Sequence, residues 1–411
     1  MKKVCVIGGG PAGLIAAGRA AEMGADVVLV EKNTRLGVKL LITGKGRCNI
    51  TNVESDLQFL TEKYGKNGKF LFSSFSKFGV KDVVDFFETA GVKTKVERGG
   101  RVFPVSNRST DVLVALKDYI TAGQVKVLRT AEVVKIVHRE KRIAKILLES
   151  GKSIVADNYI VCTGGKSYPE TGSNGEIYKL LSHLGHRVNK PTPSLVPVVC
   201  QDRFIKQLEG LSLKNVDISV WQDRKKKASR FGEAIFTANG MSGPIILDMS
   251  KEANQLLSTG DVKLIIDFKP ALSEPALDKR VLRDFQELNN KMFKNSLDQL
   301  LPKKLIPVIV QLSKIDGDKK VNLVSKDERK KLVKLLKSFE LKLIRVAGFD
   351  KAIVTSGGVE LKEVDPKTMQ SKIIPNLYLA GEVLDLDGPT GGYNLQVAWS
   401  TGYVAGDSAV D

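Results

Sequence analysis

The chain has 411 residues, of which 42% are apolar, and this length exceeds what one hydrophobic core usually serves, so we expect two or three domains. Its four cysteines, Cys5, Cys48, Cys162 and Cys200, lie far apart without a CxxC pair. This spacing argues against a disulfide framework, a zinc knuckle or a dithiol redox centre and favours a reducing cytoplasm.

The N-terminus begins with two lysines and a short apolar run that gives way to glycines. The run is too short for the core of a signal peptide. No later apolar run approaches the roughly 18 residues that span a membrane. We therefore expect a soluble cytoplasmic protein with no membrane partner.

Net charge is +18 and is unevenly distributed. Residues 1–190 carry +13, residues 191–345 carry +10 and residues 346–411 carry −5. So basic a surface attracts polyanions over long range and gains affinity from counterion release. A solvated lysine-rich surface is the alternative, and charge alone leaves the two open.

The first 32 residues predict a βαβ unit. The pattern is typical of buried parallel strands at Val4–Ile7 and Asp26–Val30. Between them, residues 11–23 have the pattern of a helix. The loop between the first strand and the helix matches GxGxxG, in which the glycines allow a tight turn, close approach to a pyrophosphate and close helix–strand packing. The predicted binding residues here are Gly8, Gly10, Pro11, Ala12 and Gly13.

An acidic residue, Glu31, ends the second predicted strand and is followed by Lys32. Its position suits hydrogen bonds from the hydroxyls of an adenosine ribose, while the pyrophosphate would lie at the helix N-terminus. The unit therefore predicts binding of the ADP half of a dinucleotide. It does not separate FAD from NAD.

The rest of the first half continues the α/β pattern. Residues 80–92 and 110–122 are helical in pattern, and residues 126–137 and 142–148 predict a pair of strands. A further buried strand, residues 158–161, leads to Thr163, Gly164 and Gly165. We expect these three residues to lie at the cofactor.

A change in pattern follows at residues 190–197, where three prolines occur close together and predict a domain boundary. Residues 196–270 contain short alternating runs typical of a small β domain. Residues 274–338 change to helical periodicity. From residue 352 the pattern of strands and glycine turns returns, as though the chain re-enters its first domain.

Two late segments favour FAD. The strand at residues 377–380 ends at Gly381 and Glu382, with Asp387 further on, and this resembles the flavoprotein strand whose acidic residue binds the ribitol chain, although aspartate is more usual there. Gly391, Gly392, Tyr393 and Asn394 then open a predicted helix, residues 395–405, whose N-terminus could face the flavin pyrimidine. The alternative is a structural glycine loop.

At this point the sequence resembles the BaiN/RdsA-like flavoproteins, described as NAD(P)/FAD-dependent oxidoreductases or aminoacetone oxidase-like proteins. The resemblance covers nearly the whole chain and rests on residues 43–52, 163–173, 355–359 and 381–394. It implies an α/β fold with a discontinuous Rossmann-like FAD domain, residues 1–190 and 346–411. A β-barrel-like domain, residues 191–273 and 339–345, would interrupt it and carry a helical insert, residues 274–338.

The polar loop at residues 44–52 is costly to bury without partners, so we expect it to wrap the cofactor. Gly44, Gly46, Arg47, Cys48 and Asn49 are its predicted binding residues. The Cys48 thiol could also act as an acid, because thiols are mostly protonated at neutral pH. Packing inside the loop is the alternative role.

Two further residues are candidates for catalysis. Tyr168 could stack on the flavin or substrate, and Lys351 could donate to the flavin or substrate; packing and solvation are the respective alternatives. No metal site is expected, since His183 and His186 lie outside the glycine loops and predict a helix end.

Basic clusters fall within the inserted region. Arg224, Lys225, Lys226 and Lys227 predict a hairpin tip, and Lys330 and Lys331 lie on a predicted helix face. Either cluster could follow the phosphates of RNA, and either could be plain surface. Three nearby aromatic residues could stack on bases but are expected in the core: Trp221, Phe231 and Phe236.

Together these observations predict an FAD-dependent oxidoreductase. No second GxGxxG follows a strand, so NAD(P)H, if it is the donor, binds transiently at the flavin. The resemblance implies two substrate classes: uridine in large-subunit ribosomal RNA, reduced to dihydrouridine, or a small carbonyl, amine or steroid-like molecule. A non-catalytic flavin-containing RNA-binding protein is the third alternative. The sequence does not indicate an oligomeric state.

Overall fold

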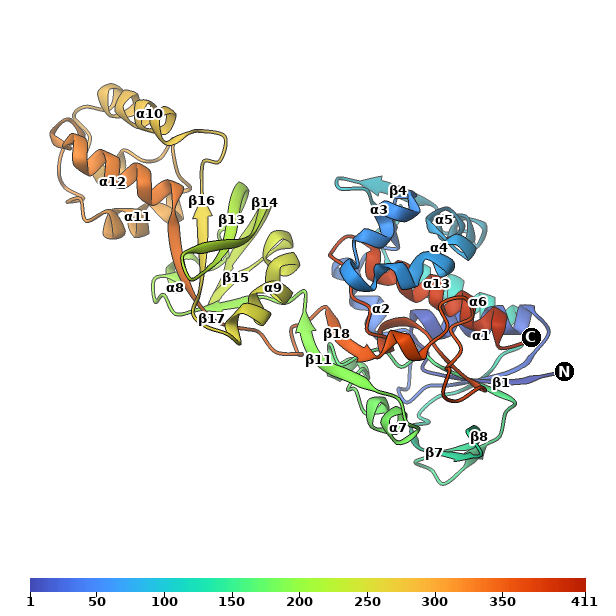
Figure 1. Cartoon of the computed structure of the whole chain (residues 1–411). Helices are drawn as coiled ribbons and strands as arrows, with labels where there is room; N and C mark the ends of the chain where they lie inside the picture. The colour runs from blue at the N-terminus through green and yellow to red at the C-terminus, as the bar shows by residue number, and fades with distance from the viewer. The chain divides into compact units, whose positions relative to one another are not determined.

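The computed structural model describes residues 1–411, which form two compact units (Figure 1). Unit 1 comprises Met1–Ser194 and Phe349–Asp411, and unit 2 comprises Leu195–Gly348. The divisions fall a few residues later than the predicted boundaries after residues 190 and 345. Two of the three prolines that marked the first boundary, Pro191 and Pro193, lie inside strand β11 (Val188–Ser194), which pairs only with β18 (Val354–Val359). A strand with a single partner tolerates proline, because one of its edges needs no donors.

The core of unit 1 is a five-stranded parallel sheet in the order β19-β10-β1-β2-β6. The three central strands are nearly continuous apolar segments, as expected for a sheet covered on both faces. The predicted βαβ unit is present, with helix α1 (Pro11–Glu22) joining β1 to β2. The strands are β1 (Lys3–Ile7), β2 (Asp26–Val30), β6 (Lys126–Leu128), β10 (Asn158–Val161) and β19 (Leu377–Leu379).

The predicted strand pair at residues 126–137 and 142–148 is wrong in part. Residues 126–128 form β6 at the edge of the parallel sheet, and of the first predicted strand only the later part, within β7 (Val133–Arg139), pairs with β8 (Arg142–Leu148). Thr130, with φ of 52°, turns the chain between β6 and β7. Both segments show the same alternation of β-branched residues, so local pattern could not assign them to different sheets.

Helix α13 (Tyr393–Ser408) packs directly on α1, and Figure 1 shows the two helices side by side. Glycine permits this close approach. A Cβ at Gly402 would lie 2.4 Å from the carbonyl oxygen of Ala12, and one at Gly406 2.4 Å from that of Ala16. The chain's last helix is thereby held against its first.

The remaining elements of unit 1 surround the sheet. Helices α5 (Val80–Thr89) and α6 (Ser109–Ala122) confirm the predicted helices. The shorter elements are α2 (Val38–Ile42), η1 (Thr43–Gly46), β3 (Thr51–Asn52), α3 (Leu57–Glu62), η2 (Gly65–Leu71), α4 (Phe72–Lys77), β4 (Thr94–Glu97), β5 (Arg101–Pro104), β9 (Ser153–Ile154), η3 (Pro169–Thr171), α7 (Ile177–His183), η7 (Leu361–Glu363) and η8 (Gly381–Val383).

Unit 2 contains a closed six-stranded barrel in the order β12-β15-β14-β13-β16-β17. Its strands alternate buried and exposed residues, as in β17, because one face lines the barrel interior. The strands are β12 (Val198–Cys200), β13 (Ser212–Gln222), β14 (Lys225–Thr237), β15 (Gly240–Ser242), β16 (Val262–Asp267) and β17 (Phe339–Val346). Helices α8 (Ile205–Leu208) and α9 (Pro244–Leu257) connect strands of the barrel.

A helical subdomain is inserted between β16 and β17 (Figure 1). It contains α10 (Glu274–Glu287), α11 (Ile306–Ser313) and α12 (Lys326–Lys337), with the short turns η4 (Phe293–Asn295), η5 (Lys303–Leu305) and η6 (Val321–Leu323). Buried apolar side chains give it a core of its own, among them Leu277, Phe293 and Leu332. No helix anywhere in the chain is both long and apolar enough to cross a bilayer.

Candidate functional site

The predicted cofactor residues gather at the carboxyl edge of the parallel sheet in unit 1. Gly8 follows β1, Glu31 follows β2, Thr163 follows β10 and Gly381 follows β19. Because the carboxyl ends of parallel strands meet at one edge, four segments distant in sequence contribute to one site.

The glycine loop has two kinds of glycine. At Gly8, φ is +106° and a Cβ would lie 2.6 Å from the carbonyl oxygen of Cys162, and at Gly13 a Cβ would lie 1.8 Å from that of Gly8. These two glycines are required by the protein's own packing. At Gly10, by contrast, φ is −84° and a Cβ would meet nothing within 4 Å. The space beside Gly10, at the uncapped N-terminus of α1, is therefore open to a ligand.

Glu31 is buried and its carboxylate is oriented by two backbone groups. Oε2 accepts a hydrogen bond from the Gly9 amide at 2.7 Å, and Oε1 accepts one from the Asn33 amide at 2.8 Å. Each oxygen retains capacity for a further donor, as ribose hydroxyls would provide. The Lys32 ammonium forms ion pairs with Glu132 at 3.5 Å and Glu176 at 3.9 Å, so its charge already has partners.

The loop at residues 43–52 is held in left-handed conformations, with positive φ at Gly44, Lys45, Gly46 and Cys48. The Arg47 guanidinium forms an ion pair with Glu97 at 2.9 Å and lies 4.0 Å from the centre of the Phe103 ring. Its Nη1 group is thus engaged within the protein, while no hydrogen bond within the protein engages Nε or Nη2. Asn49 differs, because its buried Oδ1 has no hydrogen-bond partner.

Cys48 is fully buried, and burial raises the pKa of its thiol to about 12. The thiol is protonated at neutral pH, but a side chain with no exposed surface does not reach a substrate. The geometry favours the alternative role of packing inside the loop.

Tyr168 and Lys351 lie closer to the surface. Tyr168 is half-buried with φ of 50°, its amide donates to the carbonyl of Phe349 at 3.0 Å, and burial raises the pKa of its hydroxyl. Lys351 is exposed in the turn before β18. Of the three predicted catalytic residues, these two have side chains accessible from outside.

The segments after β10 and β19 meet around Glu382. Its Oε1 accepts from the Ser167 hydroxyl and from the Thr355 amide, both at 2.7 Å, and its Oε2 accepts from the Lys39 ammonium at 2.6 Å. A Cβ at Gly165 would lie 2.4 Å from the Thr355 Oγ1. Sequence reasoning missed Lys39, because a lysine within the short apolar segment of α2 carries no motif.

The glycine turn before α13 is closed by its own side chains. Asn394 accepts from the Gly388 amide at 2.8 Å and donates to the Gly388 carbonyl at 2.9 Å. At Gly392, φ is +104° and a Cβ would lie 2.3 Å from the carbonyl of Thr51. The Tyr393 carbonyl accepts from the Tyr64 hydroxyl at 2.8 Å, and Asp387 accepts from the Ser194 hydroxyl at 3.1 Å. These residues therefore build the turn, whatever they contact beyond it.

The site fits FAD on three structural observations. The space beside Gly10 would admit a pyrophosphate, the oriented Glu31 carboxylate would receive ribose hydroxyls, and two buried polar atoms lack partners, Thr163 Oγ1 and Asn49 Oδ1. Buried polar atoms are normally hydrogen-bonded. These two unpaired atoms lie in segments predicted to bind the cofactor, and a bound ligand would supply their hydrogen-bond partners.

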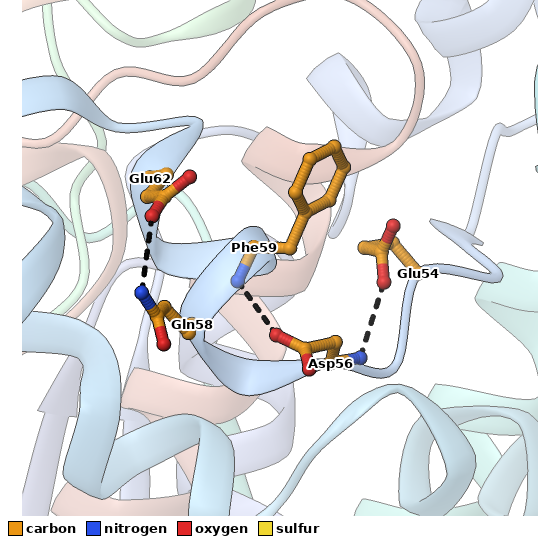
Figure 2. A pocket seen from close by; sticks show the side chains of 5 residues that line it. All are labelled: Glu54, Asp56, Gln58, Phe59 and Glu62. Carbon is orange, nitrogen blue, oxygen red and sulfur yellow. Dashed lines mark hydrogen bonds between the residues drawn. The ribbon is translucent and has the colours of Figure 1, made fainter.

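A shallow acidic hollow of about 420 Å³ lies elsewhere on unit 1 and is lined by Glu54, Asp56, Gln58, Phe59 and Glu62 (Figure 2). Figure 2 shows three local hydrogen bonds, which involve the side chains of Glu54, Asp56, Gln58 and Glu62 and which cap and brace helix α3. None of the predicted site residues lines it.

The two nearby histidines do not form a pair. His183 is exposed at the end of α7, while the buried His186 ring contacts Glu363 at 3.1 Å and the Ser371 hydroxyl at 2.8 Å. No cluster of three or more histidine, cysteine or acidic side chains suits a metal ion.

The basic hairpin tip is present in unit 2. Asp223 and Arg224, with φ of 52° and 60°, form the two-residue loop between β13 and β14, and Gln222 pairs with Lys225. Arg224 to Lys227 are all exposed. Phe236 is in the core as predicted, but Phe231 is 61% exposed, so the prediction of a core position was wrong for it. Trp221 is half-buried, and its ring N–H donates to Ser219 at 2.8 Å.

The second basic cluster lies on α12. Lys330 and Lys331 are exposed there, whereas Arg329 pairs with Asp278 at 2.8 Å and Lys337 with Asp267 at 2.6 Å. Arg329 and Lys337, which lie on the same helix, thus stabilise the helical insert.

The profile of the HI0933-like protein Rossmann domain matches residues 2–408. The chain belongs to this family. It is a flavoprotein oxidoreductase with a Rossmann-like FAD-binding domain.

Two relatives in the family align over almost the whole chain. The chain is 31% identical to "3-dehydro-bile acid delta(4,6)-reductase" of Clostridium scindens, covering 100% of both sequences. It is 30% identical to "Ribosomal RNA dihydrouridine synthase" of Haemophilus influenzae, covering 97% of this chain and 96% of that protein. Among solved structures, 3-ketosteroid-delta4-(5alpha)-dehydrogenase from Rhodococcus jostii RHA1 is similar in fold, with a TM-score of 0.54, 15% identity and coverage of 100% and 97% of the respective chains.

Proposed function

We propose that this protein reduces uridine in large-subunit ribosomal RNA to dihydrouridine. The observation that carries the proposal is the exposed basic tip of the β13–β14 hairpin, Arg224 to Lys227, in a unit with a net charge of +10. Phosphate groups are the natural partners of such a cluster. Relatives of this chain from Haemophilus influenzae and Escherichia coli, 30% and 26% identical to it, carry the name of this activity.

Phe231 adds a second feature of RNA recognition to the same strand. Its ring is 61% exposed on β14, within a few residues of the basic tip. Every nucleobase presents an aromatic face, so an exposed aromatic ring near cationic side chains suits an unpaired nucleotide.

The reaction adds a hydride to C6 and a proton to C5 of uracil. Bound FAD, once reduced by the electron donor, would supply the hydride, and the proton would come from water or from an accessible acidic side chain. The uridine must leave its stack to reach an enzyme site, so the protein must also bind the flanking backbone. Among the predicted catalytic residues we assign the substrate side to Tyr168 and Lys351, whose side chains are accessible, and we leave Cys48 in the packed loop. With only one GxGxxG in the chain, we propose NAD(P)H as a donor that binds transiently.

A specific observation supports a second candidate. The relative that is 31% identical over its full length is named a bile acid reductase, so reduction of a small unsaturated ketone is the alternative. Uracil and such a ketone share a C=C bond conjugated to a carbonyl group, and the same hydride chemistry serves both.

The test is to delete the gene and measure dihydrouridine in ribosomal RNA by mass spectrometry of nucleosides. We expect the modification to disappear and to return with a plasmid copy of the gene. A copy neutralised at Lys225, Lys226 and Lys227 should restore it poorly. Unchanged dihydrouridine in the deletion strain, together with rapid NAD(P)H consumption by the purified protein with an enone, would establish the second candidate instead.

A further inference from the structure

A lysine outside every recognised motif lies at the centre of the cofactor edge. Lys39 is on α2, and its ammonium contacts the Ser167 Oγ at 2.5 Å and the Glu382 Oε2 at 2.6 Å. The Lys39 and Glu382 side chains are only 19% and 20% exposed. A charge pair so sheltered leaves a costly lone charge when one partner is removed.

The contacts of Lys39 join four separate segments. Glu382 follows β19, Ser167 follows β10, and Thr355 on β18 donates its amide to Glu382 while its hydroxyl accepts from the Lys166 and Ser167 amides at 2.7 and 3.1 Å. Helix α2 is itself tied to the first glycine loop, since the Gly37 amide donates to the Gly9 carbonyl at 2.9 Å. Lys39 therefore connects the loop beside the pyrophosphate space with the acidic residue predicted to hold the ribitol.

The arrangement fixes the direction of the Glu382 carboxylate. Three donors converge on its two oxygens, and one of them is a cation. A carboxylate can accept about four hydrogen bonds, so capacity remains for a ligand hydroxyl. Without Lys39, Glu382 would lose its only cationic partner and could rotate towards solvent.

We infer that Lys39 is a positioning residue for the flavin, acting through Glu382 and Ser167. The inference depends on flavin binding but is independent of whether the substrate is RNA or a small molecule. In this role Lys39 holds Glu382, the residue predicted to bind the ribitol chain of the cofactor. Lys39 itself does not contact the substrate.

The test measures the dissociation constant for FAD of the full-length apoprotein by quenching of flavin fluorescence. Removing a charged hydrogen-bond partner should weaken FAD binding by about tenfold to a hundredfold in Lys39→Met. Lys39→Arg should recover most of the affinity, because it restores a cationic donor. Lys81→Met, which removes an exposed lysine that is also paired with a carboxylate, that of Asp85 on α5, is the matched control and should bind FAD as the wild type does.

A double-mutant cycle separates positioning from general destabilisation. In a Glu382→Gln background, Lys39→Met should weaken FAD binding little further, because its effect passes through the carboxylate. Thermal unfolding of each apoprotein shows whether the fold is retained. Equal losses of affinity in the two backgrounds, or a folded Lys39→Met protein with wild-type affinity, would overturn the inference. Failure of the wild-type protein to bind FAD would instead overturn the cofactor assignment itself.

Discussion

At the scale of single residues, the glycine loop separates what the fold needs from what the ligand needs. Gly13 is required by packing, because a Cβ there would lie 1.8 Å from the Gly8 carbonyl oxygen, whereas a Cβ at Gly10 would meet nothing within 4 Å. The sequence motif marks both glycines alike. Only the tertiary structure tells the two requirements apart.

Two alanine variants test this distinction. Gly13→Ala should lower the free energy of unfolding of the apoprotein by roughly 1–3 kcal/mol or more, as overpacking does. Gly10→Ala should leave it within about 0.5 kcal/mol of wild type but should weaken FAD binding at least about tenfold, because the methyl group occupies the ligand's space. Urea unfolding and FAD titration measure the two effects. Normal FAD binding by Gly10→Ala would contradict the assigned pyrophosphate space.

The buried cysteines predict instability at high pH. Burial raises the pKa of Cys5, Cys48 and Cys200 to about 12, and also raises that of Cys162. In the unfolded chain these thiols ionise near pH 8.5. A raised folded-state pKa gives stability that is complete below the unfolded pKa and is lost as pH rises towards 12, at about 1.4 kcal/mol per pH unit for each thiol.

The measurement is the free energy of unfolding between pH 8 and 11. It should fall with rising pH, and the fall should be shallower in Cys5→Ala, which removes one buried thiol. Tyrosines and lysines titrate in both proteins and cancel in the comparison. An identical slope in the variant would show that Cys5 does not contribute.

At the scale of elements, the β13–β14 hairpin carries the case for RNA. Strand β14 pairs with β15 only through Ile235–Thr237. The rest of β14 has β13 as its only strand partner, so its other edge is open. Lysines on an open strand edge also prevent pairing with another chain, so they have a purely structural explanation as well. Salt dependence and self-association distinguish the two roles.

We expect neutralisation of Lys225, Lys226 and Lys227 to weaken RNA binding. If each lysine neutralises a phosphate, the slope of log affinity against log salt should fall by roughly two to three units. Phe231→Ala should weaken binding without changing that slope, since stacking releases no counterions. Filter binding over a range of salt concentrations measures both. Aggregation of the lysine variant with unchanged affinity for RNA would favour edge protection.

At the scale of the whole molecule, unit 2 is a continuous insertion, Leu195–Gly348, whose strands pair only with each other. The two strands that flank it pair in unit 1, with Ser194 opposite Val354. The chain therefore leaves and re-enters unit 1 near one place, which is the geometry that allows insertion of a domain.

Replacement of unit 2 by a short glycine-serine linker should give a folded protein that still binds FAD, because all predicted cofactor residues lie in unit 1. The same protein should lose affinity for RNA. Flavin absorbance after gel filtration and an RNA-binding assay measure the two outcomes. A colourless protein would show that unit 2 contributes to the cofactor site.

The sequence by itself determined the first βαβ unit, the strand that ends at Gly381, the inserted β domain with its helices, and the hairpin tip. Each depends on local periodicity or turn chemistry, which neighbouring residues carry. Tertiary structure decided that Lys126–Leu128 joins the parallel sheet, that Arg47 is engaged by Glu97, that Phe231 is exposed and that Lys39 contacts Glu382. The contacts among these features link residues up to 343 positions apart in the chain. No local sequence pattern predicts which distant side chain will lie opposite a given residue.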